Sequence, residues 1–376
     1  MRNFTTTFFF MSLFYTLVAN DELVIVKGVI KDKQTSEPIS FAHITIGNKV
    51  TITDINGEFA VPIESPTKKL VLKISYQGYE THIEEVTDYD KYYEIFIIPS
   101  TIRLEDVRVR SGPEIMRNVF NNFFINYTME SQLLEAYYRE MMKDTLDYCY
   151  VTEGIMNIYT PSNIDRFRTP IVKLQRSRKK IYKPVEEENF LTGNASDMAH
   201  SSIWRFDSFL GEKNRDNYHY FYDGVSTIGD HNVLIVDFEP KNEKGNTSGT
   251  LFIDDITYAI LRIEYHPNTE ESEFWDDVSW TEEYELLYGS FDLVSTTFNG
   301  IADGGSKLYT AVLIVHHSRV EYDIPSDEEL MDIIGINDTF IKKAEEDTQG
   351  DFWEGFHTLK LNDRVAAQIN TENYDF

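Results

Sequence analysis

The spacing of hydrophobic residues changes once along the chain, near Ser111. Between Val24 and Val109, apolar and polar residues alternate in short segments that turn residues separate, as in "LVIVKGVIKD", "FAHITIGN" and "GEFAVPI". The pattern shows no helical run between these segments. Short strands at this spacing predict a small antiparallel β-sandwich.

The segment that begins at Ser111 has a helical period instead. In "SGPEIMRNVFNNFFINY" apolar residues recur three and four positions apart, which predicts an amphipathic helix. Ser111 is suited to cap the helix, and Pro113 to occupy its first turn. The residues predicted to share its apolar face are Ile115, Val119, Phe120, Phe123, Phe124 and Tyr127.

Longer alternating segments return after this helix, and a charged stretch from Pro161 to Ala199 interrupts them. Because each segment leads to the next through a short turn, they predict a long curved antiparallel sheet packed on the helix. The last residues are acidic and less regular. There "SDEELMDII" predicts a short helix, and Trp353 an aromatic anchor.

These patterns predict a mainly β chain of four parts. The parts are a signal peptide at 1–20, a β-sandwich at 21–110, an α+β domain of helix and antiparallel sheet at 111–321, and an acidic C-terminal tail at 322–376. The apolar core of the first part, Phe8 to Val18, is too short to span a bilayer and is typical of a cleaved secretion signal. An uncleaved anchor is the alternative.

The charge balance limits the partners of the chain. A formal net charge of −28 repels nucleic acid and bare anionic lipid, so we expect no nucleic-acid partner. Cys149 is the only cysteine, which excludes an internal disulfide. Its position between aromatic residues predicts a small buried hydrophobe rather than a reactive thiol.

Three motifs follow one another in the first part of the chain. They are "KGVIKDKQTSEPISFAHITI", "TDINGEF" and "LVLKISYQGYE". In this order they resemble the carboxypeptidase regulatory-like domain, which has a transthyretin-like fold, over roughly residues 24 to 100. Such domains commonly lead envelope proteins in bacteria of the Bacteroidetes group. The resemblance therefore implies a location in the periplasm or at the outer membrane.

The second half carries further similarities. "SQLLEAYYREMM", "YVTEGIMNIY" and "DFWEGF" resemble the remainder of a Bacteroidetes envelope family that carries this domain. "SGTLFIDDITYAILRIEY" is similar to the lipoprotein-carrier type of half-barrel. These resemblances imply an exported module, peripherally associated with the outer membrane, whose partner is an envelope protein or a lipid.

Two short patterns invite a metal-site interpretation. "TDINGEF" has Asp54 and Asn56 before a glycine, but it lacks the third early oxygen ligand and the late glutamate of a calcium loop. We predict a hairpin turn there, in which Asn56-Gly57 supplies positive φ and Asp54 bonds the backbone. His82 and Glu85 have the H-x-x-E spacing, but three residues along a strand they face opposite ways.

The chain shows no pattern of catalytic or cofactor-binding residues. His316 and His317 are adjacent on a strand, so they point to opposite faces, and "GNTSG" places its serine one position late for a nucleophile elbow. We therefore predict no catalytic residues, no metal ligands and no cofactor.

One cluster of basic residues has two interpretations. Six basic residues lie within "KLQRSRKKIYK": Lys173, Arg176, Arg178, Lys179, Lys180 and Lys183. They form either a contact for an anionic partner or a solvated strand or loop whose charges balance the nearby "EEEN". The second interpretation is favoured.

The aromatic residues of the helix also have two interpretations. Phe120, Phe123, Phe124 and Tyr127 form with the sheet either a closed core or an open apolar cup for lipid. Periodicity cannot separate the two, because both need apolar residues at the same positions.

These observations predict a non-catalytic, exported envelope protein that acts as a binding or scaffolding module at the outer membrane. The alternative is a periplasmic carrier of lipid or lipoprotein, which requires an open cup between the helix at 113–127 and the sheet. A third hypothesis, a hydrolase, requires a cleft with converging titratable groups, and the sequence shows no such set.

Overall fold

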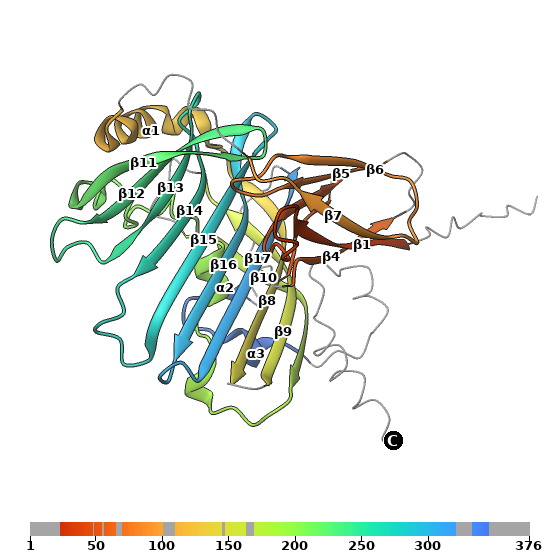
Figure 1. Cartoon of the computed structure of the whole chain (residues 1–376). Coiled ribbons are helices and arrows are strands. Elements are labelled where there is room, and N and C mark those ends of the chain that lie inside the picture. Colours follow the sequence, from red (N-terminus) through yellow and green to blue (C-terminus); the bar gives the residue numbers. More distant parts are fainter. Residues whose placement is uncertain are drawn as a thin grey trace, which may run out of the picture.

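The computed structural model describes residues 23–47, 49–54, 56–64, 70–100, 110–144, 147–162, 169–320 and 333–345. Within these ranges the fold is mainly β, as the sequence predicts. A small two-sheet sandwich lies against one face of a long twisted sheet, and helices cover the other face (Figure 1).

The sandwich contains the first seven strands. They are β1 (Leu23–Asp32), β2 (His43–Ile46), β3 (Lys49–Ile52), β4 (Glu58–Glu64), β5 (Leu70–Ser75), β6 (His82–Val86) and β7 (Tyr92–Ile97). The sheets have the orders β4-β1-β7 and β3-β2-β5-β6. Most pairs are antiparallel, but β1 and β7 pair in parallel, which the alternating pattern alone does not reveal.

The predicted turn is present, but it does not form a hairpin, because the strands it connects, β3 and β4, belong to different sheets and do not pair. Asp54 Oδ1 accepts hydrogen bonds from the backbone N–H groups of Asn56 (2.9 Å) and Glu58 (2.8 Å). Gly57 has the positive φ predicted for this turn, at +73°. Glycine is also needed here for space, because a Cβ would lie 2.6 Å from the carbonyl oxygen of Ile30.

The large sheet contains eleven strands. They are β8 (Gln132–Asp144), β9 (Tyr148–Thr160), β10 (Ile171–Ile181), β11 (Tyr218–Ile228), β12 (His231–Pro240), β13 (Thr247–Asp254), β14 (Ile260–Pro267), β15 (Trp275–Leu287), β16 (Ser290–Ala302), β17 (Lys307–Val320) and β18 (Ile333–Ile334). β11 to β17 form the predicted meander. β17 then pairs with β8, so the order continues β17-β8-β9-β10-β18.

Helices and one long connection cover what we call the inner face of this sheet. The helices are α1 (Gly112–Asn126), α2 (Asn194–Met198) and α3 (Phe340–Lys343), with short 3-10 turns η1 (Glu187–Asn189) and η2 (Arg215–Asn217). Ser111 caps α1, as predicted, by accepting a hydrogen bond from the Glu114 N–H through its side chain. Ile115, Val119 and Phe123 of α1 are buried against the sheet.

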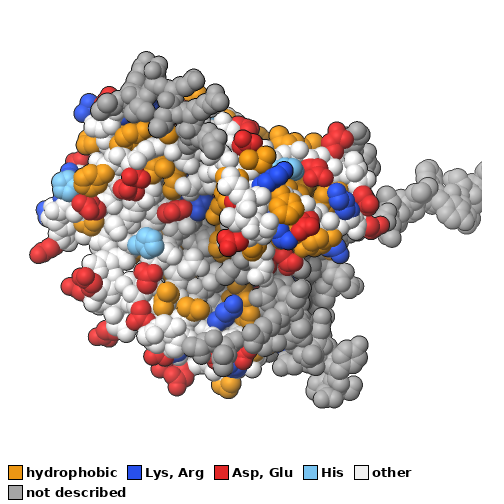
Figure 2. Space-filling model, viewed as in Figure 1, with side chains coloured by type: hydrophobic (Ala, Val, Ile, Leu, Met, Phe, Trp, Pro, Cys, Tyr) orange, Lys and Arg blue, Asp and Glu red, His pale blue; other side chains and the backbone are white. Residues whose placement is uncertain are grey.

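The sandwich packs against the opposite, outer face. Ile52 and Phe41 of the sandwich contact an apolar patch of β8, β9 and β17, which consists of Tyr137, Ile155, Val312 and Ile314. The Gly78 N–H also donates to the carbonyl of Thr227 in β11 (2.9 Å). On the face shown in Figure 2, acidic side chains are scattered over both parts of the molecule, and hydrophobic ones gather over the sandwich.

Some predicted elements differ from the structure. The stretch 161–199 contains strand β10 and helix α2, so it does not simply interrupt the sheet. Ile333 and Ile334, at the end of the predicted C-terminal helix, form strand β18 and pair with β10, because their apolar side chains complete the sheet edge there. The signal peptide at 1–20 and Trp353 lie outside the described residues.

Candidate functional site

A pocket opens on the inner face, just beyond the C-terminal end of α1. Its floor comes from β8, β9 and β17, where Leu134, Ile158 and Val315 point to the inner face. The hairpin of β15 and β16 and the connection after α2 supply its walls, including Phe291 and Trp204. The pocket has a volume of about 60 Å³.

The space between α1 and the sheet is filled with side chains. Phe123 and Tyr127 are 6% and 2% exposed, and Phe120 packs at the border of the same core. Phe124 is a correction to the predicted apolar face, because it is 55% exposed. One residue after Phe123, it is rotated about 100° around the helix and so lies beyond the face that contacts the sheet. The pocket therefore lies beside α1 rather than beneath it.

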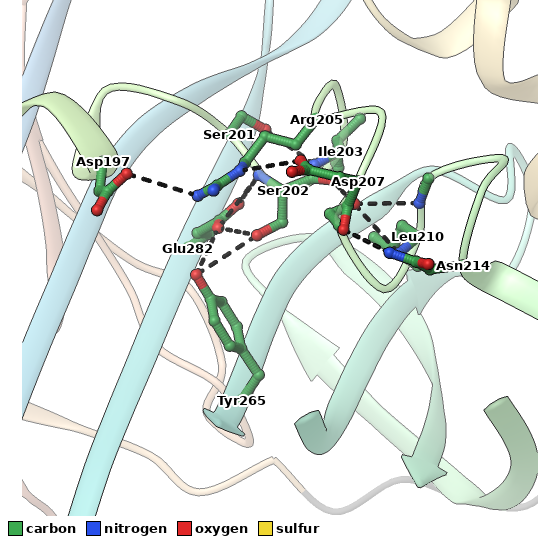
Figure 3. A network of polar contacts seen from close by, with 12 residues as sticks. Asp197, Ser201, Ser202, Ile203, Arg205, Asp207, Leu210, Asn214, Tyr265 and Glu282 are labelled. Atoms are coloured by element: carbon green, nitrogen blue, oxygen red, sulfur yellow. Dashed lines mark hydrogen bonds and ion pairs between the residues drawn. The ribbon is translucent and has the colours of Figure 1, made fainter. Parts of the chain in front are cut away.

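A buried carboxylate holds the pocket wall against the sheet. Glu282 on β15 is 2% exposed and accepts hydrogen bonds from the Ser202 N–H (3.0 Å), Ser202 Oγ (2.5 Å) and the Tyr265 hydroxyl (3.1 Å) (Figure 3). It also accepts one from the Tyr284 hydroxyl. Because a buried carboxylate is stable only when its oxygens are paired, these bonds fix the chain at Ser202.

The same wall is connected to α2 and to the following turn. Arg205 lies 3.8 Å from a carboxylate oxygen of Asp197 and 3.8 Å from one of Asp207 (Figure 3). The side-chain amide of Asn214 donates to the carbonyl of Asp207 (2.6 Å). The outer groups are half-buried at most, so each contributes less than the buried bonds of Glu282.

Ser201 and His200 are neighbours in the pocket lining, but they do not form a nucleophile–base pair. Ser201 Oγ hydrogen-bonds the Tyr284 hydroxyl (2.7 Å) and accepts from the Ile203 N–H (3.2 Å). Among the described residues, none hydrogen-bonds the imidazole of His200. A serine nucleophile needs a base within hydrogen-bond reach, so this arrangement lacks the contact on which such catalysis depends.

Two uncharged polar groups of the lining are held without protein partners. Burial, with Arg205 acting in the same direction, lowers the pKa of His200 to about 4, so its imidazole is neutral at pH 7. Gln132, at the start of β8, is 8% exposed, and no described residue hydrogen-bonds its carboxamide. Gln132 lines the pocket, so a ligand or ordered water there would pair with its carboxamide.

A second buried carboxyl group lies deeper on the inner face. Glu140 on β8 is fully buried, and burial raises its pKa to about 8, although a hydrogen bond from the Tyr138 hydroxyl (2.6 Å) acts in the opposite direction. No residue in the described part of the chain hydrogen-bonds its Oε1. Glu140 is therefore largely protonated at pH 7.

The predicted basic cluster lies on β10 and just beyond it, and it does not form one surface. Arg178 pairs with the buried Glu153 on β9. Lys179 reaches the carbonyl of Ile341 in α3 (3.1 Å), and Lys183 pairs with Asp144 (2.8 Å). The predicted cluster consists of Lys173, Arg176, Arg178, Lys179 and Lys180 on β10 and Lys183 just after it.

The charge partners of this cluster also differ from the predicted ones. The carboxylate of Glu187, within "EEEN", pairs with Lys342 (2.6 Å) rather than with β10. Burial alone would raise the pKa of Glu153, but Arg139 and Arg178 lower it to about 2. Part of the cluster therefore neutralises a buried carboxylate inside the sheet.

Other residues that the sequence singles out lie apart from the pocket. His82 lies 3.4 Å from Glu84, its neighbour but one on β6. Cys149 is buried, and burial raises the pKa of its thiol, as is typical of an unreactive cysteine. The side chains of His316 and His317 lie outside the described residues. In the described part of the chain, no group of three or more His, Cys, Asp and Glu residues is placed to hold a metal ion.

Sequence reasoning did not identify the residues of the pocket. Gln132 comes from one segment and His200 and Trp204 from another, and none of the three has a motif around it. The polar alternation at the start of β8 is the one available signal, since Gln132 occupies an inward position that is otherwise apolar.

Comparison with known proteins identifies the first domain. Residues 26–109 match the model of the CarboxypepD_reg-like domain, which confirms the resemblance noted from the sequence motifs. No curated protein sequence matches the chain.

Two solved structures are similar to the second half. They are a LolA superfamily protein from Nitrosomonas europaea (11% identity, 58% of this chain and 96% of that one, TM-score 0.30) and a DUF1329 family protein from Desulfovibrio piger (11% identity, 58% and 95%, TM-score 0.29). Likeness at this level supports no inference about what the chain binds. None of the helices in the described part of the chain has the length and apolar character needed to cross a membrane.

Proposed function

With a CarboxypepD_reg-like domain at residues 26–109, we propose that the protein is a non-catalytic, exported binding module of the cell envelope. Its ligand site is the pocket on the inner face. The observation that carries this proposal is Gln132, whose buried carboxamide lines an otherwise apolar floor without a partner in the described structure. Apolar walls with a few convergent polar groups are typical of ligand sites.

The absence of catalysis is part of the proposal. Its support is the pairing of Ser201 with Tyr284 instead of His200, which leaves the serine without a base among the described residues. The sandwich would then act as a rigid support, because it packs on the outer face, opposite the pocket. We place the protein in the periplasm, in peripheral contact with the outer membrane.

The test is to fill the pocket and follow its ligand. Leu134→Trp would place a larger ring in the floor, and Leu308→Trp, at an exposed position on β17, is the matched control. We expect the native protein and Leu308→Trp to retain a co-purifying small molecule, detected by mass spectrometry, and Leu134→Trp to lose it. Retention by Leu134→Trp, or no ligand in any preparation, would contradict the proposal.

A separate assay tests the non-catalytic part. The purified protein is incubated with ester, peptide and glycoside substrates, and His200→Ala is the matched variant. We expect no turnover by either. Hydrolysis that His200→Ala abolishes would show that the pocket is an active site.

A carrier of lipid or lipoprotein is the second candidate, but the open cup that it requires between α1 and the sheet is filled by side chains in this structure, so α1 would have to move. Trp204 favours it, because this ring lines the pocket and also contacts Phe123 and Tyr127 beneath α1, with centroids 5.2 and 6.0 Å apart. An acyl chain entering the pocket would follow these rings and displace α1. A pocket of about 60 Å³ is far below the roughly 300 Å³ of small-molecule sites, so such a ligand requires this movement.

Hydrogen exchange distinguishes the carrier from the small-ligand module. For a carrier, bound lipid should increase amide exchange in α1, because the helix leaves the sheet. For a small ligand, exchange in α1 should remain unchanged or decrease. A stoichiometric lipid in the native preparation would support the carrier.

A further inference from the structure

The size of the pocket limits what enters it. A water molecule occupies roughly 10–15 Å³ on the same measure of cavity volume, so about 60 Å³ holds a group of roughly four to six non-hydrogen atoms. A whole sugar ring or an extended acyl chain is larger. The pocket therefore receives one substituent of a ligand whose remainder stays outside.

The described charges around the pocket do not favour an anionic substituent. None of the described residues that line it is Lys or Arg, whereas Glu130 and Asp292 both belong to the lining. His200 is neutral at pH 7 because burial lowers its pKa. A phosphate or carboxylate would lose its hydration here without gaining a positive partner among the described residues, which is unfavourable.

The Gln132 carboxamide matches an amide better than it matches a cation. It offers two N–H donors and one carbonyl acceptor. A cationic group such as an ammonium only donates, so it would pair with the carboxyl groups of the lining but would leave the N–H groups of Gln132 without an acceptor. An amide both donates and accepts, and a side-by-side arrangement of two amides satisfies both partners.

The floor of the pocket is apolar and favours an apolar group on the ligand. Leu134, Ile158 and Val315 are 8%, 2% and 2% exposed and present only apolar atoms through their side chains. A methyl or methylene group at this depth removes apolar surface from water, which stabilises the complex by about 0.8 kcal/mol per carbon. The ligand therefore has an apolar end next to its amide.

We propose that the pocket binds an uncharged acetamido group, with its amide paired to the Gln132 carboxamide and its methyl on the floor of Leu134, Ile158 and Val315. This inference rests on the proposed function, since it assigns a ligand class to the same site. Two sources carry this chemistry, N-acetylated amino sugars and N-acetylated peptides.

Titration calorimetry with the full exported chain tests the inference. The probes are tri-N-acetylglucosamine for the sugar source and N-acetyl-alanine amide for the peptide source, with glucosamine trimer and alanine amide as their unacetylated controls. We expect at least one acetylated probe to bind, and both unacetylated controls to bind at least about tenfold more weakly. The probe that binds identifies the source. Equal binding of acetylated and unacetylated probes would overturn the inference.

Variants of Gln132 test its role. Gln132→Leu keeps the approximate volume and removes the amide, and we expect it to weaken the acetylated probe about tenfold. Gln132→Glu should weaken it further, because it introduces a buried charge. Gln175→Leu, at an exposed position on β10, is the matched control and should bind as the native chain does. Unchanged affinity in folded Gln132→Leu, verified by thermal melting, would overturn the assignment.

Different results would overturn the acetamido assignment and the proposal that the pocket is the ligand site. If neither acetylated probe binds but Leu134→Trp still removes the native co-purifying ligand, the pocket is the ligand site and the acetamido assignment is wrong. If neither acetylated probe binds and Leu134→Trp also retains that ligand, the pocket is not the ligand site and both proposals are wrong.

Discussion

His43 of the sandwich lies between two carboxylates of the large sheet. Its Nδ1 is 3.1 Å from Glu285 Oε1, and its Nε2 contacts Glu283, with both glutamates on β15. Burial alone would lower the pKa of His43, but these carboxylates raise it to about 10. The imidazolium therefore donates to both strand residues at pH 7 and fixes the sandwich on the outer face.

His43→Leu should destabilise the protein by about 3 kcal/mol at pH 6, because it leaves Glu283 and Glu285, which are only 15% and 29% exposed, without this counter-charge. Denaturant unfolding measures the change in the free energy of unfolding. His82→Leu removes a partly exposed imidazole of the same domain and should cost less than about 1 kcal/mol. Equal effects of the two substitutions would show that the docking contact is unimportant.

The cost of His43→Leu should also depend on pH. The folded pKa of His43 is about 10 and its unfolded value about 6.5, so its stabilisation is complete below pH 6.5 and disappears as the pH rises to 10. The folded pKa of Glu283 is about 2, so its own stabilisation is lost as the pH falls below 4.5. The difference between native and variant proteins should therefore be largest between pH 4.5 and 6.5.

Glu140→Gln should stabilise the protein at neutral pH. The folded pKa of Glu140 is about 8 against 4.5 when unfolded, so its effect on stability is favourable below pH 4.5 and is lost as the pH rises to 8. A neutral amide of the same shape avoids that loss, and we expect a gain of about 2 kcal/mol at pH 7 that vanishes at pH 4. Urea unfolding at both pH values measures it.

Glu135→Gln is the control for this prediction, because Glu135 is exposed on the same strand. It should change the free energy of unfolding by less than about 0.5 kcal/mol at either pH. A loss of stability in Glu140→Gln at pH 7 would mean that the carboxyl group has a specific partner in solution.

Ser202→Ala should loosen the pocket wall. It removes the 2.5 Å bond from Ser202 Oγ to the buried Glu282, and we expect a loss of about 1–3 kcal/mol in the free energy of unfolding. Affinity for the co-purifying ligand should also fall, because Ser201 and Trp204 are positioned by this contact. Ser306→Ala, on the exposed turn between β16 and β17, should change neither quantity.

Gly57→Ala should destabilise the sandwich more than a substitution that only requires positive φ. The new Cβ would meet the carbonyl oxygen of Ile30 at 2.6 Å in addition to φ of +73°, so we expect a loss above about 2 kcal/mol. Gly304→Ala has φ of +64° and open space around it, and should cost about 1 kcal/mol. Equal melting temperatures for the two variants would exclude the predicted clash.

The sequence predicts the local elements better than their partners. Alternation predicts the strands, Ser111 the start of α1 and Asp54 the turn after β3, because each depends on nearby residues. That this turn joins two sheets instead of forming a hairpin depends on distant pairing. The parallel pairing of β1 with β7 depends on contacts between distant segments, and alternation is identical for either partner. Phe124 is a similar case on a helix. Its position in the pattern is apolar like that of Phe123, but only Phe123 is buried against the sheet.

The pocket was harder to predict for the same reason. Gln132 and His200 are ordinary residues in the sequence, and they become functional candidates because burial leaves them unpaired beside an apolar floor. The basic cluster shows the opposite case. Arg178 suggests an anionic partner in the sequence, but the fold supplies one internally at Glu153.

The pairing of β8 with β17 has a consequence for how the chain reaches this structure. Lys307 pairs with Asp144 and Val320 with Leu133, so nearly the whole second domain lies between residues that are neighbours in the middle of the sheet. Bringing the two ends of so long a loop together costs entropy before the pairing of β8 with β17 supplies any stabilisation. High contact order therefore slows folding. Synthesis from the N-terminus completes the sandwich first, whereas the centre of the large sheet must wait for β17. We therefore expect a slow refolding phase that belongs to the second domain.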